Sequence, residues 1–277
     1  MRVADLLREA AGALAAAGVP DAARDARVLM AHAADLPADR IVLHLDDRVD
    51  APRQAAFRRL VAARLERRPV SQIVGHRLFR GRRFRVTPDV LDPRPETETL
   101  VAAALDGRFR RVLDLGTGSG CILLTLLSER PGASGLGVDV SAAALEVAAA
   151  NRDDLGLAGR AELAAGSWFA PVSGRFDLIV SNPPYIAADE MLALAPEVRD
   201  WEPRVALTPG GDGLDAYRAI VAGLGAHLAP GGRVLFEIGP TQGAAVTSLI
   251  AAQGLAGIRI LPDLDGRDRV VAAEHPG

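Results

Sequence analysis

A side-chain amide, two prolines and a phenol follow directly on a short apolar run, in the sequence Asn182-Pro183-Pro184-Tyr185. Proline has no N–H and pushes the preceding residue into an extended conformation, so the carbonyls of Asn182 and Pro183 should be free to accept hydrogen bonds. Together with the Asn182 side-chain oxygen, this loop can accept both hydrogens of a planar NH₂ group, with the Tyr185 ring against its face. Such a loop suits an amide or an exocyclic base amine. The alternative is a turn that merely ends a strand.

A glycine-rich turn precedes this loop, in the sequence Asp114-Leu115-Gly116-Thr117-Gly118-Ser119-Gly120. Its glycines let a ligand approach the backbone, and Asp139, at the end of the next apolar run, is placed to accept the hydroxyls of a ribose. The dinucleotide fingerprint G-x-G-x-x-G/A would require a small residue where Cys121 stands, whereas the spacing here is G-x-G-x-G. The pattern therefore favours S-adenosylmethionine over NAD. The alternative is a glycine turn chosen only for tight packing.

Alternating strands and helices must position these groups. Strands are expected at 111–115, 135–140, 161–164, 176–181, 233–238, 257–261 and 269–273, with helices between them, including 142–153, 214–228 and 241–253. This alternation indicates an α/β fold with a parallel sheet covered on both faces. The last connection, 262–268, is too short for a crossover, so the final strand is expected to be antiparallel.

The first part of the chain has a different pattern. Helical periodicity at 2–17 and 22–34, with Asp21 as a possible N-cap, and a third helix at 52–67 behind Asp50 predict a small helical bundle. Two short apolar segments around Arg80-Gly81-Arg82-Arg83 predict a hairpin. We expect a helical domain at 1–75, a hairpin and proline-rich connector at 76–98, and a catalytic domain at 99–277.

The composition of the 277 residues is that of a globular protein with a net charge of −3, which excludes a general polyanion binder. All 32 cationic residues are arginine. Eleven of them lie between 53 and 85, opposed there only by Glu66, which indicates either a solvated helix face or a docking surface for an acidic partner or RNA. The single Cys121 fits a reducing compartment and the histidines lack metal-ligand spacing, so we expect a cytoplasmic protein without a metal site. No apolar stretch is long enough to span a membrane.

In its motifs the chain resembles class I S-adenosylmethionine-dependent methyltransferases, and most closely the release factor glutamine methyltransferases, the HemK/PrmC family. The resemblance covers nearly the whole chain. It rests on Asp25-Ala26-Arg27-Val28-Leu29, Pro93-Arg94-Pro95-Glu96-Thr97-Glu98, the glycine turn, Ser167-Trp168-Phe169, Asn182 to Tyr185, Glu202-Pro203-Arg204, Gly211-Asp212-Gly213-Leu214 and Glu237-Ile238-Gly239. Asp92 departs from the family, which more often has an apolar residue there.

The resemblance implies a Rossmann-like sheet of seven strands and methylation of the glutamine side-chain amide in the Gly-Gly-Gln motif of class 1 peptide chain release factors. By motif match, it places the S-adenosylmethionine contacts on Gly116, Thr117, Gly118, Ser119, Gly120, Asp139, Trp168 and Asn182, and the substrate contacts on Asn182, Pro183, Pro184 and Tyr185. The catalytic group is expected to be Asn182, Pro183 and Tyr185. The helical domain is expected to dock the release factor, and the enzyme to act as a monomer.

Three alternatives remain at this point. The same loop would serve an amino methyltransferase acting on adenine or cytosine of DNA or RNA, although no further module that could read bases follows the catalytic domain. A non-catalytic nucleotide-binding module would not need the Asn182 loop. An NAD oxidoreductase would bind NAD, which calorimetry would detect.

Overall fold

The computed structural model describes residues 1–277, which form two compact units. One unit contains residues 1–76 together with 195–201, and we call it the helical unit. The other contains residues 77–194 and 202–277, and we call it the sheet unit. Each unit has its own apolar core. No helix in either unit has both the length and the apolar character needed to cross a bilayer.

The helical unit is a bundle whose core contains Leu6, Leu14, Leu29 and Phe57, all fully buried. Its elements are α1 (Val3–Ala16), α2 (Ala22–Ala34), the 3₁₀ helix η1 (Ala38–His44), α3 (Ala51–Leu65), α4 (Val70–Val74) and α8 (Pro196–Arg199). The sequence patterns correctly predicted the three long helices.

The structure tests the predicted N-cap residues of two of these helices. The Asp50 side chain accepts a hydrogen bond of 2.8 Å from the Arg53 backbone N–H, so the predicted start of α3 is confirmed. The prediction of Asp21 as the N-cap of α2 is wrong, because Asp21 has a left-handed backbone with φ of 53° and its side chain forms no capping bond. An N-cap residue needs an extended backbone to aim its side chain at the first turn.

Residues 195–201 are bound within the helical unit although they are far along the chain. The Arg64 guanidinium lies between two carboxylates, with Nε 2.7 Å from Asp25 and Nη2 2.9 Å from Glu197. Arg67 donates a second bond of 2.8 Å to Glu197. Trp201, the last residue of the segment, is held by two hydrogen bonds: its indole N–H donates to the Glu66 carbonyl, and its own carbonyl accepts from the Gln72 side chain.

The arginine-rich region 53–85 is largely neutralised by the fold. Six of its eleven arginines pair with carboxylates that lie outside that region in the sequence: Arg53 with Asp50, Arg64 with Asp25 and Glu197, Arg67 with Glu197, Arg77 with Asp92, Arg82 with Glu129 and Arg85 with Asp154. These ion pairs reduce the excess of positive charge in the region, and the choice between a solvated helix face and a docking surface stays a prediction. Local sequence could not show these carboxylates, because all but Asp50 are more than ten residues from their partners.

The predicted hairpin, β1 (His76–Phe79) and β2 (Arg82–Arg85), lies at the start of the sheet unit, and only its first residue, His76, is grouped with the helical unit. Seven strands then form one sheet: β3 (Arg111–Leu115), β4 (Ser134–Asp139), β5 (Ala161–Ala165), β6 (Phe176–Ser181), β7 (Leu228–Glu237), β8 (Ala256–Pro262) and β9 (Asp268–Glu274). Their order is β5-β4-β3-β6-β7-β9-β8. β9 is antiparallel to both of its neighbours, which confirms the α/β class and the antiparallel last strand. β7 begins five residues earlier than predicted, beyond an irregularity in its pairing with β6.

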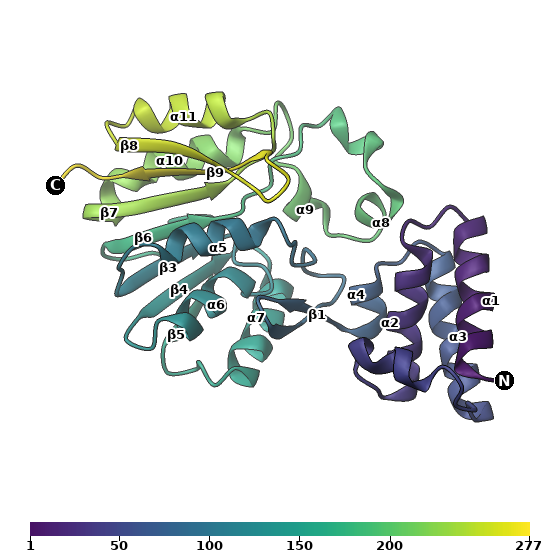
Figure 1. The fold of residues 1–277 in the computed structure, drawn as a ribbon. Helices are drawn as coiled ribbons and strands as arrows, with labels where there is room; N and C mark the ends of the chain where they lie inside the picture. The colour runs from purple at the N-terminus through teal and green to yellow at the C-terminus, as the bar shows by residue number, and fades with distance from the viewer. The chain divides into compact units, whose positions relative to one another are not determined.

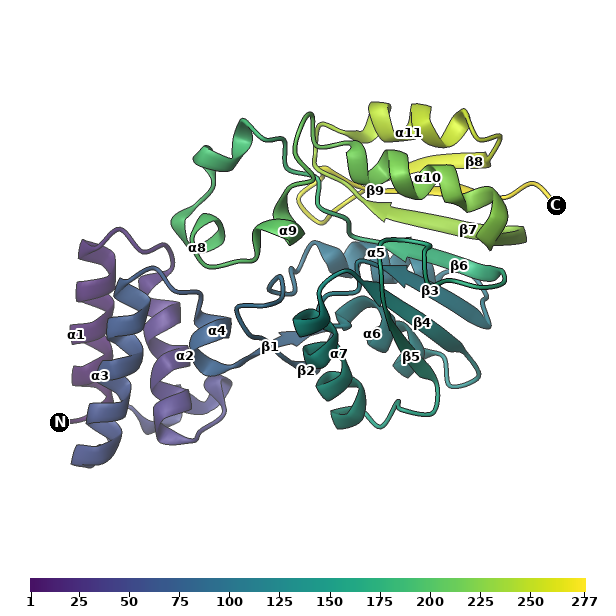
Figure 2. The same cartoon turned by 180° about the vertical axis from the view of Figure 1, so that it is seen from behind.

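Helices cover both faces of this sheet (Figures 1 and 2). Side chains of one face, such as Val112 and Leu178, pack with α5 (Thr97–Leu105) and α6 (Cys121–Glu129). Side chains of the other face, such as Leu113 and Ile179, pack with α10 (Asp215–His227) and α11 (Gly243–Ala251). Because alternate residues of a strand point to opposite faces, central strands buried on both sides must be apolar throughout. The remaining helices of the unit are α7 (Ala142–Asp154), η2 (Glu190–Ala193) and α9 (Arg204–Leu207).

The strand order reverses next to β3, which has β4 on one side and β6 on the other. Crossovers leave β3 and β6 toward opposite faces of the sheet, so a crevice opens at the carboxyl ends of these two strands. The glycine turn follows β3, and the Asn182 loop follows β6. The topology therefore brings the two motifs to the same crevice.

Candidate active site

Three strands end at the same level in this crevice. Leu115 of β3 is in register with Ser181 of β6 and with Val138 of β4. The next residues along the three strands are Gly116, Asn182 and Asp139. The Ser181 hydroxyl fixes the first of these pairings, since it donates a bond of 2.6 Å to the Leu115 carbonyl. Sequence positions spread over 67 residues thus meet at one edge of the sheet.

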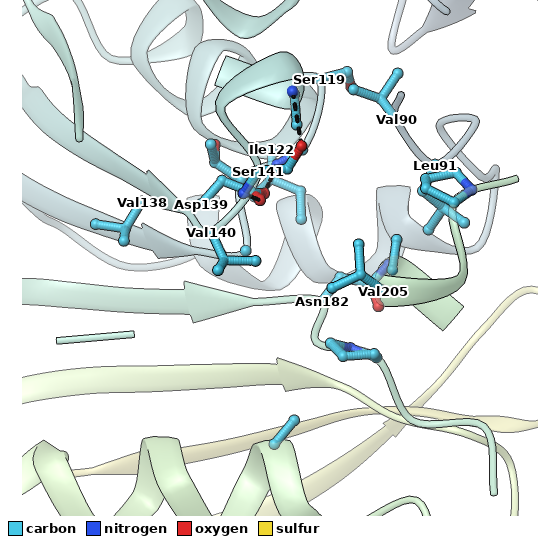
Figure 3. A pocket seen from close by; sticks show the side chains of 18 of the residues that line it. Val90, Leu91, Ser119, Ile122, Val138, Asp139, Val140, Ser141, Asn182 and Val205 are labelled. Carbon is cyan, nitrogen blue, oxygen red and sulfur yellow. Dashed lines mark hydrogen bonds between the residues drawn. The ribbon is translucent and has the colours of Figure 1, made fainter. Parts of the chain in front are cut away.

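A cavity of about 460 Å³ opens where they meet. This volume is within the range of about 300–1,000 Å³ typical of small-molecule sites. Figure 3 shows Val138, Asp139 and Ser141 on one side of it and Asn182 with Val205 on another. The connector contributes Val90 and Leu91 to its wall.

A hydrogen bond joins the Asp139 side chain to the glycine turn. The Asp139 carboxylate accepts from the Gly118 backbone N–H at 2.8 Å through Oδ2 and from the Ser141 N–H at 2.9 Å through Oδ1. Each carboxylate oxygen has two acceptor directions, so one on each remains for a pair of hydroxyls. Gly118 has φ of 54°, and a Cβ added there would meet no protein atom within 4 Å. The backbone is thus open to a ligand, and these residues fit the nucleoside of S-adenosylmethionine.

Trp168 forms part of the cavity wall beside the turn. Its backbone has φ of 49°, a left-handed conformation that costs a non-glycine residue roughly 1–3 kcal/mol and is found mainly at functional sites. The Trp168 ring approaches Gly116, where a Cβ would lie 3.8 Å from it. This flat apolar surface beside the ribose acceptor could cover an adenine ring.

Asp114 lies beneath the turn and is completely buried. Its Oδ2 accepts a bond of 2.7 Å from the Thr117 hydroxyl, and its Oδ1 has no partner. Burial raises the pKa of Asp114 to about 7, although the bond from Thr117 opposes this rise. Asp114 therefore supports the conformation of the turn from below the cavity.

The loop after β6 is held by Gln242, the residue that precedes α11. Gln242 Nε2 donates a bond of 2.9 Å to the Tyr185 carbonyl, while its Oε1 accepts from the Gly239 N–H at 3.0 Å. The backbone at Gly213 approaches the same carbonyl so closely that a Cβ there would lie 2.3 Å from it. Gln242 and the backbone at Gly213 therefore both hold the Tyr185 end of the loop.

At the other end of the loop, the Asn182 side-chain amide contacts Thr97. Its Nδ2 donates to the Thr97 hydroxyl at 3.4 Å, and its Oδ1 remains available as an acceptor. Since Asn182 lines the cavity, this oxygen can meet a donor that enters it. The arrangement can hold an NH₂ group close to a bound nucleoside.

Comparison with known proteins identifies the family. Two family models match: the PrmC N-terminal domain over residues 5–75 and the methyltransferase small domain over residues 95–214. A release factor glutamine methyltransferase of Cereibacter sphaeroides is 62% identical, over 100% of this chain and 99% of the relative. One of Rhodospirillum rubrum is 48% identical, over 98% of this chain and 84% of the relative.

The chain belongs to the release factor glutamine methyltransferase family. It is an S-adenosylmethionine-dependent methyltransferase, as the motifs predicted. Among solved structures, the hMettl16 catalytic domain in complex with MAT2A 3′UTR hairpin 1 is similar, with a TM-score of 0.57 and 16% identity over 82% of this chain and 81% of that one. At this identity the likeness shows a shared fold alone.

In this family member, most of the residues named from sequence line one cavity. They are Gly116, Thr117, Gly118, Ser119, Asp139, Trp168, Asn182 and Pro184. Gly120, Pro183 and Tyr185 do not line it. Gly120 has φ of 79° and packs near Leu124 of α6, while the Tyr185 ring packs against the apolar core, and its burial raises the pKa of the phenol to about 12.

Sequence reasoning missed two residues that contact the loop of this methyltransferase: Thr97, which accepts a hydrogen bond from the Asn182 side chain, and Gln242, which donates one to the Tyr185 carbonyl. Thr97 lies within a motif that carried the family resemblance, but nothing in its spacing indicated a role. Both act across the fold, from the start of α5 and from the residue before α11. A buried polar residue can be recognised as such only once burial is known.

Proposed function

We propose that this enzyme methylates the side-chain amide nitrogen of the glutamine in the Gly-Gly-Gln motif of class 1 peptide chain release factors. The observation that supports this most directly is the Asn182 amide, which is held with Nδ2 toward Thr97 and Oδ1 free on the cavity wall. Glutamine presents a planar NH₂ group, and Oδ1 is an acceptor of the right kind for it. S-adenosylmethionine, when bound, supplies an electrophilic methyl group.

The chemical difficulty is the weak nucleophilicity of an amide nitrogen. Its lone pair is delocalised into the carbonyl, a resonance reflected in the barrier of about 18–20 kcal/mol to C–N rotation. An acceptor placed outside the amide plane, at Asn182 Oδ1 on the cavity wall, would draw a hydrogen out of that plane and favour a pyramidal nitrogen. The lone pair then becomes available for attack.

Removal of the proton from the methylated nitrogen needs less help from the protein than activation of the amide nitrogen does. Methylation leaves a positively charged amide nitrogen, which is acidic enough to lose its proton to an acceptor or to water without a strong base. The loop therefore acts mainly by positioning and by accepting hydrogen bonds, contributions that lower a barrier when they are fixed before reaction. Gln242 and Gly213 supply this fixation at Tyr185.

We also propose a division of labour along the chain. Residues 99–277 carry the catalytic groups, 76–98 form the connector, and 1–75 dock the body of the release factor. The support is chemical: a glutamine side chain offers few atoms to bind, and remote contacts can position a reacting group on a flexible loop. We further propose that the enzyme works as a cytoplasmic monomer.

Labelled S-adenosylmethionine offered to a bacterial lysate tests the substrate class. We expect label in a protein of release factor size, with little in the nucleic acid fraction. The Asn182→Ala enzyme is the control, because it should transfer little label to any acceptor. Preferential labelling of DNA or RNA would instead support an adenine or cytosine amino methyltransferase, which the same loop could serve.

A further inference from the structure

A buried ion pair joins two segments that border the cavity. Arg94 Nη2 donates to both carboxylate oxygens of Glu202, each at 2.8 Å, although the two residues are 108 positions apart in the chain. The Glu202 side chain is 1% exposed and the Arg94 side chain 33% exposed. A glutamate is almost never buried to this degree unless it is paired, and loss of its partner leaves an uncompensated buried charge. The pair therefore holds both segments together.

Arg94 belongs to the connector, which forms part of the cavity wall. Asp92, Pro93 and Thr97 line the cavity together with Arg94. The Arg94 carbonyl accepts from the Thr97 N–H at 3.2 Å, and the Thr97 hydroxyl accepts from the Asn182 side chain. Prolines on both sides of Arg94 fix their own φ, so the backbone here has little freedom. Fixing the guanidinium thus fixes the stretch of connector that contacts Asn182.

Glu202 directly precedes a second part of the cavity wall, residues 203–209, which we call the wall segment. Most residues of the wall segment line the cavity. Figure 3 shows its Val205 on the side of the cavity where Asn182 lies, whereas Asp139 lies on another side. Val205 is 55% exposed, so it presents an apolar surface beside Asn182. The wall segment therefore borders the part of the cavity that contains Asn182.

The wall segment cannot hold its own shape. Its one helix, α9, has only four residues, and a helix of this length is not stable by itself. Contacts with the rest of the sheet unit must therefore keep it in place. Near its end, the Leu207 carbonyl accepts from the Ile186 N–H at 3.0 Å, just after the loop that follows β6. At its start, the contact is the ion pair between Glu202 and Arg94.

We propose that Arg94 and Glu202 are positioning residues that hold the wall segment and the connector together around the path of the substrate glutamine to Asn182. This inference rests on the proposed function, in which Asn182 binds the substrate amide. When the pair is broken, the two parts of the wall can separate, and the substrate loses contacts on both. The cofactor site is less affected, because the hydrogen bonds of Asp139 with the glycine turn do not involve the pair.

Two substitutions and their combination test the pair. Glu202→Gln and Arg94→Gln each remove one charge, and the double variant leaves two amides that can still bond to each other. Glu129→Gln is the matched control, because it breaks a pair of 2.7 Å with Arg82, and neither residue lines the cavity.

KM and kcat are measured on a Gly-Gly-Gln peptide with saturating S-adenosylmethionine. Burial raises the pKa of Glu202 to about 7, so the assays are run at about pH 8, where its carboxylate is ionised. Calorimetry gives the Kd for the cofactor, and thermal melting shows whether each variant is folded.

We expect each single variant to raise KM for the peptide by at least about tenfold, the effect of losing one hydrogen bond to a charged group, with a smaller change in kcat. The Kd for S-adenosylmethionine should be nearly unchanged. The double variant should lose no more than the worse single variant, because both changes remove the same interaction. Glu129→Gln should match the wild type. A purely structural role would not confine the loss to KM for the peptide.

A folded Glu202→Gln enzyme with the wild-type KM would overturn the proposal. So would a loss of cofactor affinity as large as the rise in KM, since the pair would then serve the cofactor. Losses that multiply in the double variant would also contradict it, because the two residues would then act separately. If Glu202→Gln does not fold, Arg94→Gln decides by the same criteria, since the Arg94 side chain is partly exposed.

The proposed function can fail separately from this inference. If Asn182→Ala is inactive while Arg94→Gln and Glu202→Gln both match the wild type, the proposed function stands and only the role of the ion pair is wrong. If Asn182→Ala transfers methyl groups normally, the proposed role of the loop is wrong, and the inference about the ion pair is overturned with it.

Discussion

At the scale of single residues, Asp139 combines hydrogen bonds to the backbone with a position on the cavity wall, and the sequence indicated only the second of these. It accepts from the backbone at Gly118 and Ser141, and so holds the glycine turn open, while its remaining acceptor directions face the cavity. If Asp139 also binds the ligand as proposed, an uncharged side chain of similar size should weaken both the turn and the binding.

Replacing Asp139 with Ala should weaken S-adenosylmethionine binding by more than tenfold, because each charge-assisted hydrogen bond contributes about 1.5–3 kcal/mol. Isothermal titration calorimetry gives the Kd directly. Asp153→Ala is a suitable control, since Asp153 is exposed near the end of α7. Equal affinities of Asp139→Ala and wild type would remove Asp139 from the cofactor site.

Replacement of Asn182, unlike that of Asp139, should affect the rate of methyl transfer more than the affinity for S-adenosylmethionine. In Asn182→Ala the single-turnover rate on a Gly-Gly-Gln peptide should fall by about a hundredfold or more, as when one positioned hydrogen-bonding group is removed from a reacting centre. The cofactor Kd should change less, because Asp139 and the glycine turn remain. Near-normal chemistry in this variant would show that the loop is only a turn.

At the scale of elements, the crevice depends on strand ends in register and on a loop anchored from outside its own strand. The end of β6 could be located from its apolar run and from the prolines that follow. The anchor could not, because Gln242 lies 57 residues from Tyr185 and its position opposite that carbonyl depends on the packing of α11. Local patterns encode strands and turns well, whereas cross-fold hydrogen bonds arise only from tertiary packing.

Gln242→Ala should therefore lower kcat with little effect on cofactor affinity. The variant loses both the bond to the Tyr185 carbonyl and the bond from Gly239, so the loop gains conformations that do not react. A fall of about tenfold is expected from one lost neutral bond to the loop. Gln253→Ala, on an exposed glutamine after α11, should leave kcat unchanged. If the two variants behave alike, the loop does not need this anchor.

The buried ion pairs of the helical unit give a prediction about stability. Burial alone would raise the pKa of Glu197, but hydrogen bonds from Arg67 and Arg64 outweigh it and lower the pKa below the usual 4.5. A lowered pKa in the folded state means that this stabilisation is present at neutral pH and is lost as pH falls below 4.5. Asp25 still pairs with Arg64 when Glu197 is replaced, which limits the loss.

Glu197→Gln should thus reduce the free energy of unfolding at pH 7 by about 1–3 kcal/mol, the range for a buried charged partner left unpaired. Its deficit relative to wild type should shrink in acid. Glu9→Gln, on the exposed face of α1, is the matched control and should change stability by less than about 0.5 kcal/mol. A Glu197→Gln deficit that is the same at pH 7 and pH 4 would contradict the charge-based explanation.

At the scale of the whole molecule, the sequence predicted the class of fold and the antiparallel last strand, and most of the site residues that it named line one cavity. It did so because hydrophobic periodicity and glycine or proline punctuation are local properties. It could not show the ion pairs of the region 53–85, whose arginines are opposed within that interval only by Glu66. Charge balance is a property of the folded chain, and carboxylates as distant as Glu197 and Asp154 supply it.

The two-unit chain should discriminate between a whole release factor and a fragment of it. If the helical unit contributes even one well-packed contact of about 2–4 kcal/mol, kcat/KM on the intact protein should exceed that on a short Gly-Gly-Gln peptide by at least about thirtyfold. The full-length enzyme is used for both substrates, and steady-state rates give the ratio. Equal values would remove the docking role of residues 1–75.

The most direct test combines purified enzyme, isotopically labelled S-adenosylmethionine and a purified class 1 release factor, followed by mass spectrometry of the peptide that contains Gly-Gly-Gln. We expect one labelled methyl group on the side-chain nitrogen of that glutamine, and none when glutamine is replaced by alanine or when the enzyme carries Asn182→Ala. A methyl group on another residue, or an unmodified release factor beside labelled RNA or DNA in a mixed reaction, would contradict the proposed function.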